Sequence, residues 1–186
     1  MIKRICCKMP IIRPIDYTSQ EPVWLICNVS KTGIGAMYGQ GPAWDQCQPA
    51  SFISKKFLAA QQHYAVHKLE TLAILEALQK WLDKLMGLRL HVIMDHKALE
   101  FFSSQGQLSS RQRRWIEYML RFNFDITYVE GKYNKVADCL SQYYESDTNA
   151  DVHSPDDYMQ TDRRIDPEWE DLSKHRVQEL EEQRTA

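Results

Sequence analysis

The chain has 186 residues, of which 44% are hydrophobic, and this suits one globular domain with an extension. Basic and acidic residues almost balance, 23 against 25, so the total charge predicts no particular partner. The charge is unevenly distributed, because residues 1–142 carry a net +6 and residues 143–186 a net −8. This pattern indicates either a polyanion-binding body with a solvated acidic tail or ordinary surface charge.

The cysteines and apolar runs bear on cellular location. The five cysteines form no CxxC pair and no Cys/His cluster with zinc spacing. Cys27 and Cys139 lie in apolar runs and are expected to be small core residues. The apolar run at the amino terminus is too short for a signal peptide, and no stretch approaches a membrane span. The sequence therefore predicts an intracellular, reducing location without a membrane partner, and does not distinguish cytoplasm, particle and nucleus.

Three strands are predicted in the first third of the chain, over residues 22–27, 34–38 and 50–54. The first is a continuous apolar run, and glycines on both sides of the second indicate a hairpin with it. Residues 1–21 contain a short apolar pattern interrupted by prolines, so we interpret them as the end of a preceding region.

A long helix is predicted over residues 60–84, where apolar side chains recur at spacings of three and four. Glu70 falls on the apolar stripe of this helix. A buried carboxylate is costly unless it is paired or bound to a metal, so Glu70 is a candidate functional residue. Glu76 and Lys80 lie off the stripe, and no special role is predicted for them.

The second half of the chain continues the alternation of strands and helices. A fourth strand over 88–94 delivers Asp95 at its carboxyl end, and a short helix is predicted over 98–102. Ser109 or Ser110 is positioned to cap a helix over 111–122.

A fifth strand is predicted over 125–129, followed by a short helix that Asn134 caps and that carries Asp138. The folded domain is predicted to span 22–144. Residues 145–186 are rich in Asp, Ser and Thr, lack a clear apolar period and are predicted to be a largely disordered acidic linker.

This order of elements predicts a mixed α/β sheet in which strand ends and the long helix bring Asn28, Glu70 and Asp95 together. Clustered carboxylates repel one another unless divalent cations neutralise them, and Mg²⁺ or Mn²⁺ prefers such oxygen ligands. Two ions about 3.5–4 Å apart can activate water and stabilise the leaving oxygen of a phosphodiester. Each carboxylate alone also has an ordinary explanation, as a turn cap or a solvated helix residue.

Four segments carry a resemblance to a known family: CNVSKTGIGAMYGQ, SFISKKFLAAQQHYAVHKLETLAILEALQKW, MDHKALEFF and LSSRQRRWIEYMLRFNFDITYVEGKYNKVADCLSQ. In this order they resemble the ribonuclease H domain that follows reverse transcriptase in the polyprotein of gypsy-class LTR retrotransposons. The resemblance covers about residues 22–142. It implies a ribonuclease H-like α/β fold, a five-stranded mixed sheet with flanking helices. The segments before and after resemble the end of the polymerase region and the stretch towards integrase.

The resemblance implies cleavage of the RNA strand of RNA–DNA hybrids with two Mg²⁺ or Mn²⁺ ions. Glu70, Asp95 and Asp138 match metal-ligating positions of the family, but its TDAS motif has become Cys27-Asn28-Val29-Ser30. Asn28 therefore stands where the family has a metal-bridging aspartate. Loss of this charge is expected to cost about 10³-fold or more in rate, equivalent to about 4 kcal/mol of barrier, and to reduce ion occupancy.

The implied partners are an RNA–DNA hybrid and the remainder of a reverse transcriptase/integrase polyprotein. A non-catalytic module that binds nucleic acid or braces a polymerase remains open, and an integrase-type nuclease is disfavoured because Glu70 matches the helix position that ribonuclease H uses. Residues that could neutralise or contact phosphates are Lys55, Lys56, Arg111, Arg113, Arg114 and His96, with Tyr38 and Ser51 as weaker candidates near the cleft and Lys132 and Lys135 as more ordinary surface charges.

Overall fold

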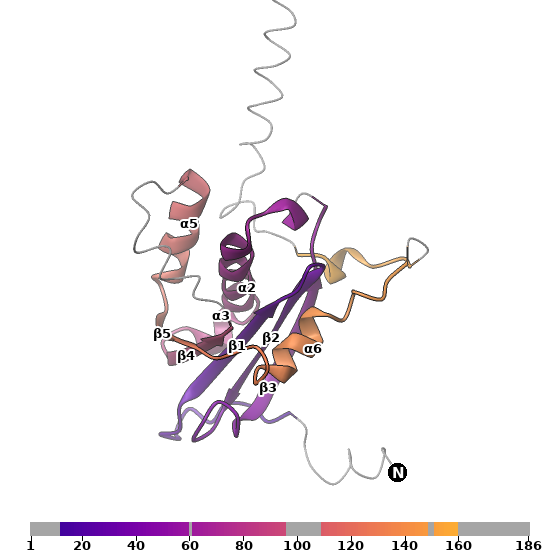
Figure 1. Cartoon of the computed structure of the whole chain (residues 1–186). Helices are drawn as coiled ribbons and strands as arrows, with labels where there is room; N and C mark the ends of the chain where they lie inside the picture. The colour runs from indigo at the N-terminus through magenta and orange to yellow at the C-terminus, as the bar shows by residue number, and fades with distance from the viewer. Residues whose placement is uncertain (1–11, 60, 96–108, 149–150, 160–186) are drawn as a thin grey trace, which may run out of the picture.

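A five-stranded sheet organises the chain in the computed structural model, which describes residues 12–59, 61–95, 109–148 and 151–159. The strand order is β3-β2-β1-β4-β5 (Figure 1). The strands are β1 (Val23–Val29), β2 (Gly33–Gln40), β3 (Gln48–Lys56), β4 (Arg89–Met94) and β5 (Asn123–Tyr128). The predicted five strands are confirmed, with ends shifted by a few residues.

The sheet is mixed. The first three strands form an antiparallel meander, whereas β4 pairs parallel to both β1 and β5. Consequently β1, β4 and β5 all end at one edge of the sheet, which is also where β2 begins and β3 ends. Loops following parallel strands meet at such an edge, and this is where open α/β sheets commonly place their sites.

The predicted helix over 60–84 is divided into three pieces: η1 (Gln61–His63), α2 (Val66–Lys80) and α3 (Leu82–Leu85). Ala65 is extended, with φ −60° and ψ 144°, so the helix begins after it. Trp81 departs from helical geometry at the other end, and its ring packs 4.8 Å from that of Tyr38. Tertiary packing of this ring therefore ends a helix that the apolar period alone would continue.

Two further helices lie in the second half, α5 (Ser110–Met119) and α6 (Lys135–Ser141). The predicted cap of α5 is confirmed at Ser109, which exchanges side-chain and backbone hydrogen bonds with Gln112 in a capping box. The predicted helix over 98–102 falls outside the described residues. No helix in the described part of the chain is long and apolar enough to cross a membrane.

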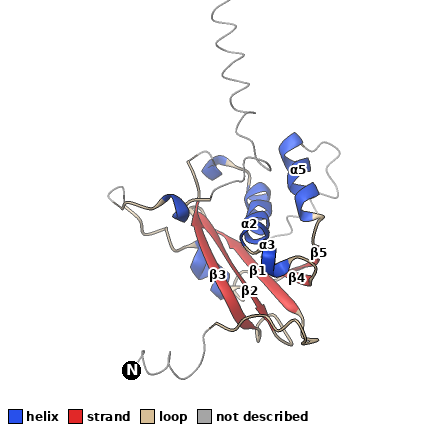
Figure 2. Cartoon of the chain, turned by 180° about the vertical axis from the view of Figure 1, so that it is seen from behind, coloured by secondary structure: helices blue, strands red, loops and turns tan. Residues whose placement is uncertain are grey.

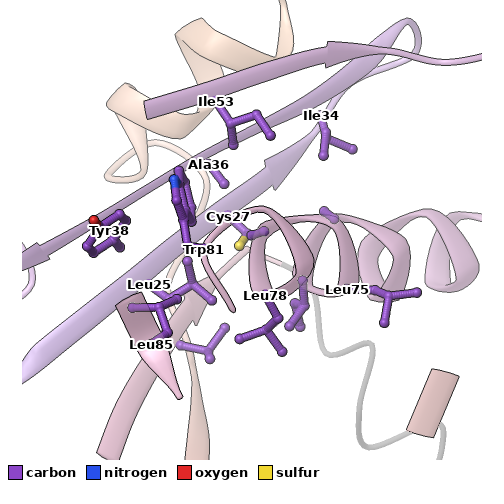
Figure 3. Packing of buried hydrophobic residues seen from close by; sticks show 14 of the residues in the cluster. Leu25, Cys27, Ile34, Ala36, Tyr38, Ile53, Leu75, Leu78, Trp81 and Leu85 are labelled. Atoms are coloured by element: carbon purple, nitrogen blue, oxygen red, sulfur yellow. The ribbon is translucent and has the colours of Figure 1, made fainter. Parts of the chain in front are cut away.

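The two faces of the sheet are covered differently. The main core lies between the sheet and α2, and Figure 3 shows Leu25, Ile34 and Leu78 within it. The opposite face holds a smaller cluster around Ile26 and Ile93, against which α6 packs. The view from behind in Figure 2 shows α2 and α3 on the face opposite to α6. Cys27 is buried as predicted, but Cys139 is exposed because α6 turns it away from the sheet.

Glu76 is buried, which corrects the prediction that it lies off the packed stripe. Every residue of α2 from Leu69 to Leu78 is buried, since α2 packs on β1 and β2 and also contacts α5. The Glu76 carboxyl lies near enough to Lys55, at the end of β3, to be affected by its charge. Burial raises the pKa of the Glu76 carboxyl from its usual 4.5 to about 7, although Lys55 and Lys80 act in the opposite direction.

The Glu76→Gln variant is expected to be more stable than the wild type at pH 8, by about 1–2 kcal/mol. Since the folded-state pKa is raised, ionisation destabilises the fold progressively as pH rises from about 4.5 to 7. The difference between variant and wild type should therefore vanish below about pH 4.5, a dependence that urea unfolding across this range measures. Glu117→Gln, at an exposed site on α5, is the matched control. A pH-independent difference would contradict the assigned cause.

The described part of the predicted acidic linker contacts the folded domain. Met159 is fully buried in the main core, and its N–H donates to the Lys56 carbonyl oxygen at 2.9 Å. The segment before β1 also packs against the sheet, since Ile15 is buried and the Arg13 N–H donates to the Pro49 carbonyl oxygen. Ordered packing thus extends on both sides of the predicted domain, residues 22–144.

Candidate active site

Asn28 and Asp95 lie at the ends of two neighbouring parallel strands. The pairing of β1 with β4 aligns Val23 with Leu90 and Ile26 with Ile93, and continuing this register sets Asn28 level with Asp95. Side chains alternate along a strand, so Asn28 shares the α6 face with Ile26. The predicted convergence of these two strand ends is therefore confirmed.

The segment that follows β5, residues 129–134, crosses the ends of β4 and β1. The Val129 N–H donates to the Met94 carbonyl oxygen at 2.9 Å, and the Asn134 side-chain amide donates to the Cys27 carbonyl oxygen at 2.9 Å. Between them, Gly131 passes so close to Asp95 that a Cβ there would lie 2.9 Å from Oδ2. Asn134 makes no side-chain cap bond to α6, which corrects the predicted capping role. It fixes the approach of the chain to α6 instead.

Helix α6 lies against β2 at Gly35, the cross-strand partner of Asn28. A Cβ at Gly35 would come within 2.3 Å of the Ala137 carbonyl oxygen and 2.4 Å of the Ser141 nitrogen. The Ser54 hydroxyl also donates to the Leu140 carbonyl oxygen at 2.7 Å, which ties the end of α6 to β3. This close approach brings the helix, and the carboxylate that it carries, within reach of Asn28.

Asn28 is hydrogen-bonded to Asp138. Its Nδ2 donates to Asp138 Oδ1 at 3.0 Å and lies 3.4 Å from the Ser141 hydroxyl, and the side chain is only 2% exposed. The same Asp138 oxygen accepts from Gln142 Nε2 at 2.7 Å. Two amide N–H groups thus donate to one carboxylate oxygen, while Asn28 Oδ1 is buried and finds no hydrogen-bond partner in the described part of the chain.

Glu70 lies in the first half of α2 on the other side of the strand ends, and it is 3% exposed. Burial, and then the charge of Asp95, raises the pKa of the Glu70 carboxyl to about 8. Burial, with a smaller effect from Glu70, also raises the pKa of the Cys27 thiol. Glu70 and Asp95 are therefore close enough to repel each other, and Glu70 Oε2 has no hydrogen-bond partner among the described residues.

Of the predicted metal ligands, Glu70 and Asp95 fit a divalent cation, whereas Asp138 does not. A buried Glu70 oxygen that no described residue contacts by a hydrogen bond, and the repulsion between Glu70 and Asp95, suit a hard cation. At Asp138 the N–H groups of Asn28 and Gln142 take the place that a cation would occupy. Among the described residues, no three His, Cys, Asp or Glu side chains lie close enough together to hold one ion. The predicted ligand set is thus divided into a Glu70–Asp95 pair and an Asn28–Asp138 pair.

Of the weaker site candidates, Tyr38 and Ser51 do not lie at the site. Tyr38 lies three residues along β2 from Gly35, where it is buried and packs on Trp81. Ser51 is the cross-strand partner of Tyr38 on β3. Both predictions were wrong, because these residues share a sheet with the site but lie nearer its opposite end.

The candidate phosphate-binding residues lie on two elements. Lys55 and Lys56 end β3 on the side of the sheet where β1 and β4 also end, which we call the site edge. Arg111, Arg113 and Arg114 lie on α5. The Arg111 guanidinium donates to the Tyr64 hydroxyl and lies 5.6 Å from the centre of its ring. Arg113 is exposed and Arg114 is half-buried. His96 lies outside the described residues, and Lys132 pairs with Glu130 at 2.5 Å, as an ordinary surface charge does.

Comparison with known sequences decides the family. The family described as "RNase H-like domain found in reverse transcriptase" matches residues 18–122, more than half of the chain. The chain belongs to this family. The resemblance read from the sequence is thereby confirmed.

Two relatives of this RNase H-like domain are transposon polyproteins. It is 33% identical over 124 residues to the retrovirus-related Pol polyprotein from transposon gypsy of Drosophila melanogaster, covering 66% of the chain and 12% of the polyprotein. It is 29% identical over 145 residues to the transposon Tf2-3 polyprotein of Schizosaccharomyces pombe, covering 76% and 11%. The chain therefore spans a small part of each relative.

Solved structures share the fold of the RNase H-like domain. A foamy viral protease-reverse transcriptase in complex with dsDNA superposes with a TM-score of 0.53 at 16% identity, over 64% of this chain and 25% of that one. A Prototype Foamy Virus protease-reverse transcriptase mutant gives 0.54 at 14% identity, over 69% and 17%. At these identities the likeness concerns the fold alone.

Several residues that shape the site of the RNase H-like domain were not predicted. None of them is charged. Gly35 allows α6 to approach β2, Ser141 lies beside the Asn28 amide, and Gln142 donates a hydrogen bond to Asp138. A glycine inside a strand often marks a close backbone approach, so Gly35 could have been found by that signal. Ser141 and Gln142 follow Asp138 by three and four residues, a spacing that places them beside it on a helix.

Proposed function

We propose that this RNase H-like domain binds RNA–DNA hybrids and that its phosphodiester hydrolysis is lost or strongly reduced. The hydrogen bond from Asn28 Nδ2 to Asp138 Oδ1, at 3.0 Å, carries this proposal. In the family an aspartate at this position would bring a second negative charge to Asp138, and a bound cation or a shared proton would have to relieve the repulsion. Here the amide relieves it without an ion.

Glu70 and Asp95 would hold the one divalent ion that the site suits. Such an ion, when bound, polarises a phosphoryl oxygen and lowers the pKa of a water. Asn28 would offer the ion a neutral oxygen, and its N–H groups would repel a second ion near Asp138. In this proposal the domain therefore lacks the paired ions on which the family's hydrolysis rests.

Binding does not require those ions. The lysines that end β3 lie at the site edge and the arginines of α5 add further positive charge, and phosphate contacts dominate the affinity of nucleic-acid complexes. The relatives are polyproteins of which this chain matches 11–12%, so we include the remainder of such a polyprotein as a partner. A binding or bracing role would persist when hydrolysis fails.

A single experiment tests binding and cleavage together. The wild-type chain, with a labelled RNA–DNA hybrid and Mg²⁺ or Mn²⁺, is expected to bind with a steep salt dependence and to release no more product than Glu70→Gln. Arg113→Ala should weaken binding several-fold and reduce the slope of log affinity against log salt by about 1, whereas Lys84→Ala, on α3, should change neither.

Two results would contradict the proposal. Turnover by the wild type that Glu70→Gln abolishes would show that Asn28 supports hydrolysis. Failure of the wild type to bind a hybrid at low salt would remove the binding role. Because affinity and product are measured on the same sample, the two failures are distinguished.

A further inference from the structure

The acidic segment that follows α6 returns to the end of β3 and covers its two lysines. We call the described part of residues 145–159 the acidic strap. Figure 1 shows this orange and yellow segment beside the end of β3. Residues 145–159 contain five acidic side chains and no lysine or arginine, so the strap has the charge sign of a nucleic-acid backbone.

Lys56 is held on two sides. Its Nζ forms an ion pair with Asp147 Oδ2 at 2.7 Å and lies 5.8 Å from the centre of the Tyr144 ring. Both charged side chains are shielded, at 19% and 18% exposure. His153 Nε2 lies 2.7 Å from the same aspartate oxygen. This ion pair is thus more enclosed than a typical surface pair, and Lys56 is not available to another anion while it persists.

Lys55 and the backbone of β3 are engaged as well. The Lys55 ammonium donates to the Asp156 carbonyl oxygen. Tyr158 forms a parallel bridge with Lys56, next to the hydrogen bond from the buried Met159 to the same residue. β3 is an edge strand, and such edges in native proteins are commonly covered or paired. The strap therefore has a backbone anchor as well as charged contacts.

We propose that the acidic strap competes within the molecule for the β3 lysines that would bind phosphates of the hybrid. The inference rests on the proposed binding function. The Asp147 carboxylate and the Asp156 carbonyl oxygen occupy the positions of phosphate oxygens on Lys56 and Lys55. A hybrid that binds across the site edge displaces these two contacts, while the buried Met159 keeps the strap attached to the domain.

The test compares hybrid affinity, by fluorescence anisotropy, of full-length wild type, Asp147→Asn and Glu145→Gln. Both variants remove one negative charge from the strap, but Glu145 is exposed and only Asp147 contacts Lys56. Asp147→Asn is expected to tighten binding about 2- to 5-fold, the range of one partly exposed ion pair. Equal tightening by both variants would show a general charge effect and overturn the proposal.

A double-mutant cycle with Lys56→Ala separates the effect of the Asp147–Lys56 ion pair from the effect of the other charges of the strap. Lys56→Ala should weaken binding, and adding Asp147→Asn to it should then give no gain. A gain that persists without Lys56 would overturn the competition. If the wild type and all variants bind the hybrid with the same affinity, the inference about the strap fails while the proposed binding function stands. If none binds, the proposed function fails, and this inference with it.

Discussion

The Asn28→Asp variant is expected to gain hybrid cleavage over the wild type, by about 10²- to 10³-fold in saturating Mg²⁺. The new carboxylate would replace the amide that now donates to Asp138 Oδ1 at 3.0 Å. Two carboxylates at this separation favour a cation between them, and saturating Mg²⁺ should compete with a shared proton, so Asp138 would join Glu70 and Asp95 as a ligand. Single-turnover cleavage of a labelled hybrid measures the gain.

The free energy of unfolding of Asn28→Asp should depend on divalent ions. Without divalent ions, repulsion between the new carboxylate and Asp138 should lower the free energy of unfolding by about 1–2 kcal/mol, and Mg²⁺ should restore it. The double variant with Glu70→Gln is the control for contaminating nuclease and should not cleave. Cleavage that stays at the wild-type level, with a stability that Mg²⁺ does not change, would mean that residues other than Asn28 also block the site.

The Gly35→Ala variant is expected to lose about 3 kcal/mol of stability, at the upper end of the range for overpacking. The added methyl would meet backbone atoms of α6 at 2.3 and 2.4 Å, and a helix backbone cannot move aside as a flexible side chain can. The shift of α6 should also break the bond between Asn28 and Asp138. Chemical denaturation measures the first effect, and the NMR signal of the Asn28 side-chain amide reports the second.

Gly87→Ala provides the matched comparison for Gly35→Ala. Gly87 has φ +84° and no atom within 4 Å of an added Cβ, so alanine there strains the backbone without displacing a neighbour. It should cost about 1 kcal/mol and leave the Asn28 amide signal unchanged. Equal losses at both positions, with the Asn28 signal intact, would contradict the role of Gly35 in seating α6.

The fold could be predicted from the sequence because its strongest signals are local. Apolar runs and nearby glycines predicted the strands, and Ser109 predicted the start of α5, which it caps. What the local pattern missed came from tertiary packing. Glu76 lies off the apolar stripe of the helix, so the pattern predicted an ordinary exposed carboxylate. In the structure every side of α2 is buried from Leu69 to Leu78. Trp81 ended the long helix for the same kind of reason.

The site was predicted only in part, because residue type and order do not give orientation. Glu70 and Asp95 were expected to meet, and the charge of Asp95 adds to burial in raising the pKa of Glu70. The sequence also pointed to Asn28 as the altered position. It did not show that the amide would bond directly to Asp138, since that contact depends on how closely α6 approaches β2 at a glycine.

The burial of Met159 sets a limit on where this chain can be cut. Its side chain belongs to the main core, and its N–H completes a hydrogen bond to the end of β3. A protease acting between Asp147 and Met159 would detach a core residue, unpair the end of an edge strand and free two lysines in one step. On the carboxyl side, a cut that leaves the domain intact therefore has to follow Met159, well beyond the last residue that contacts Asp138.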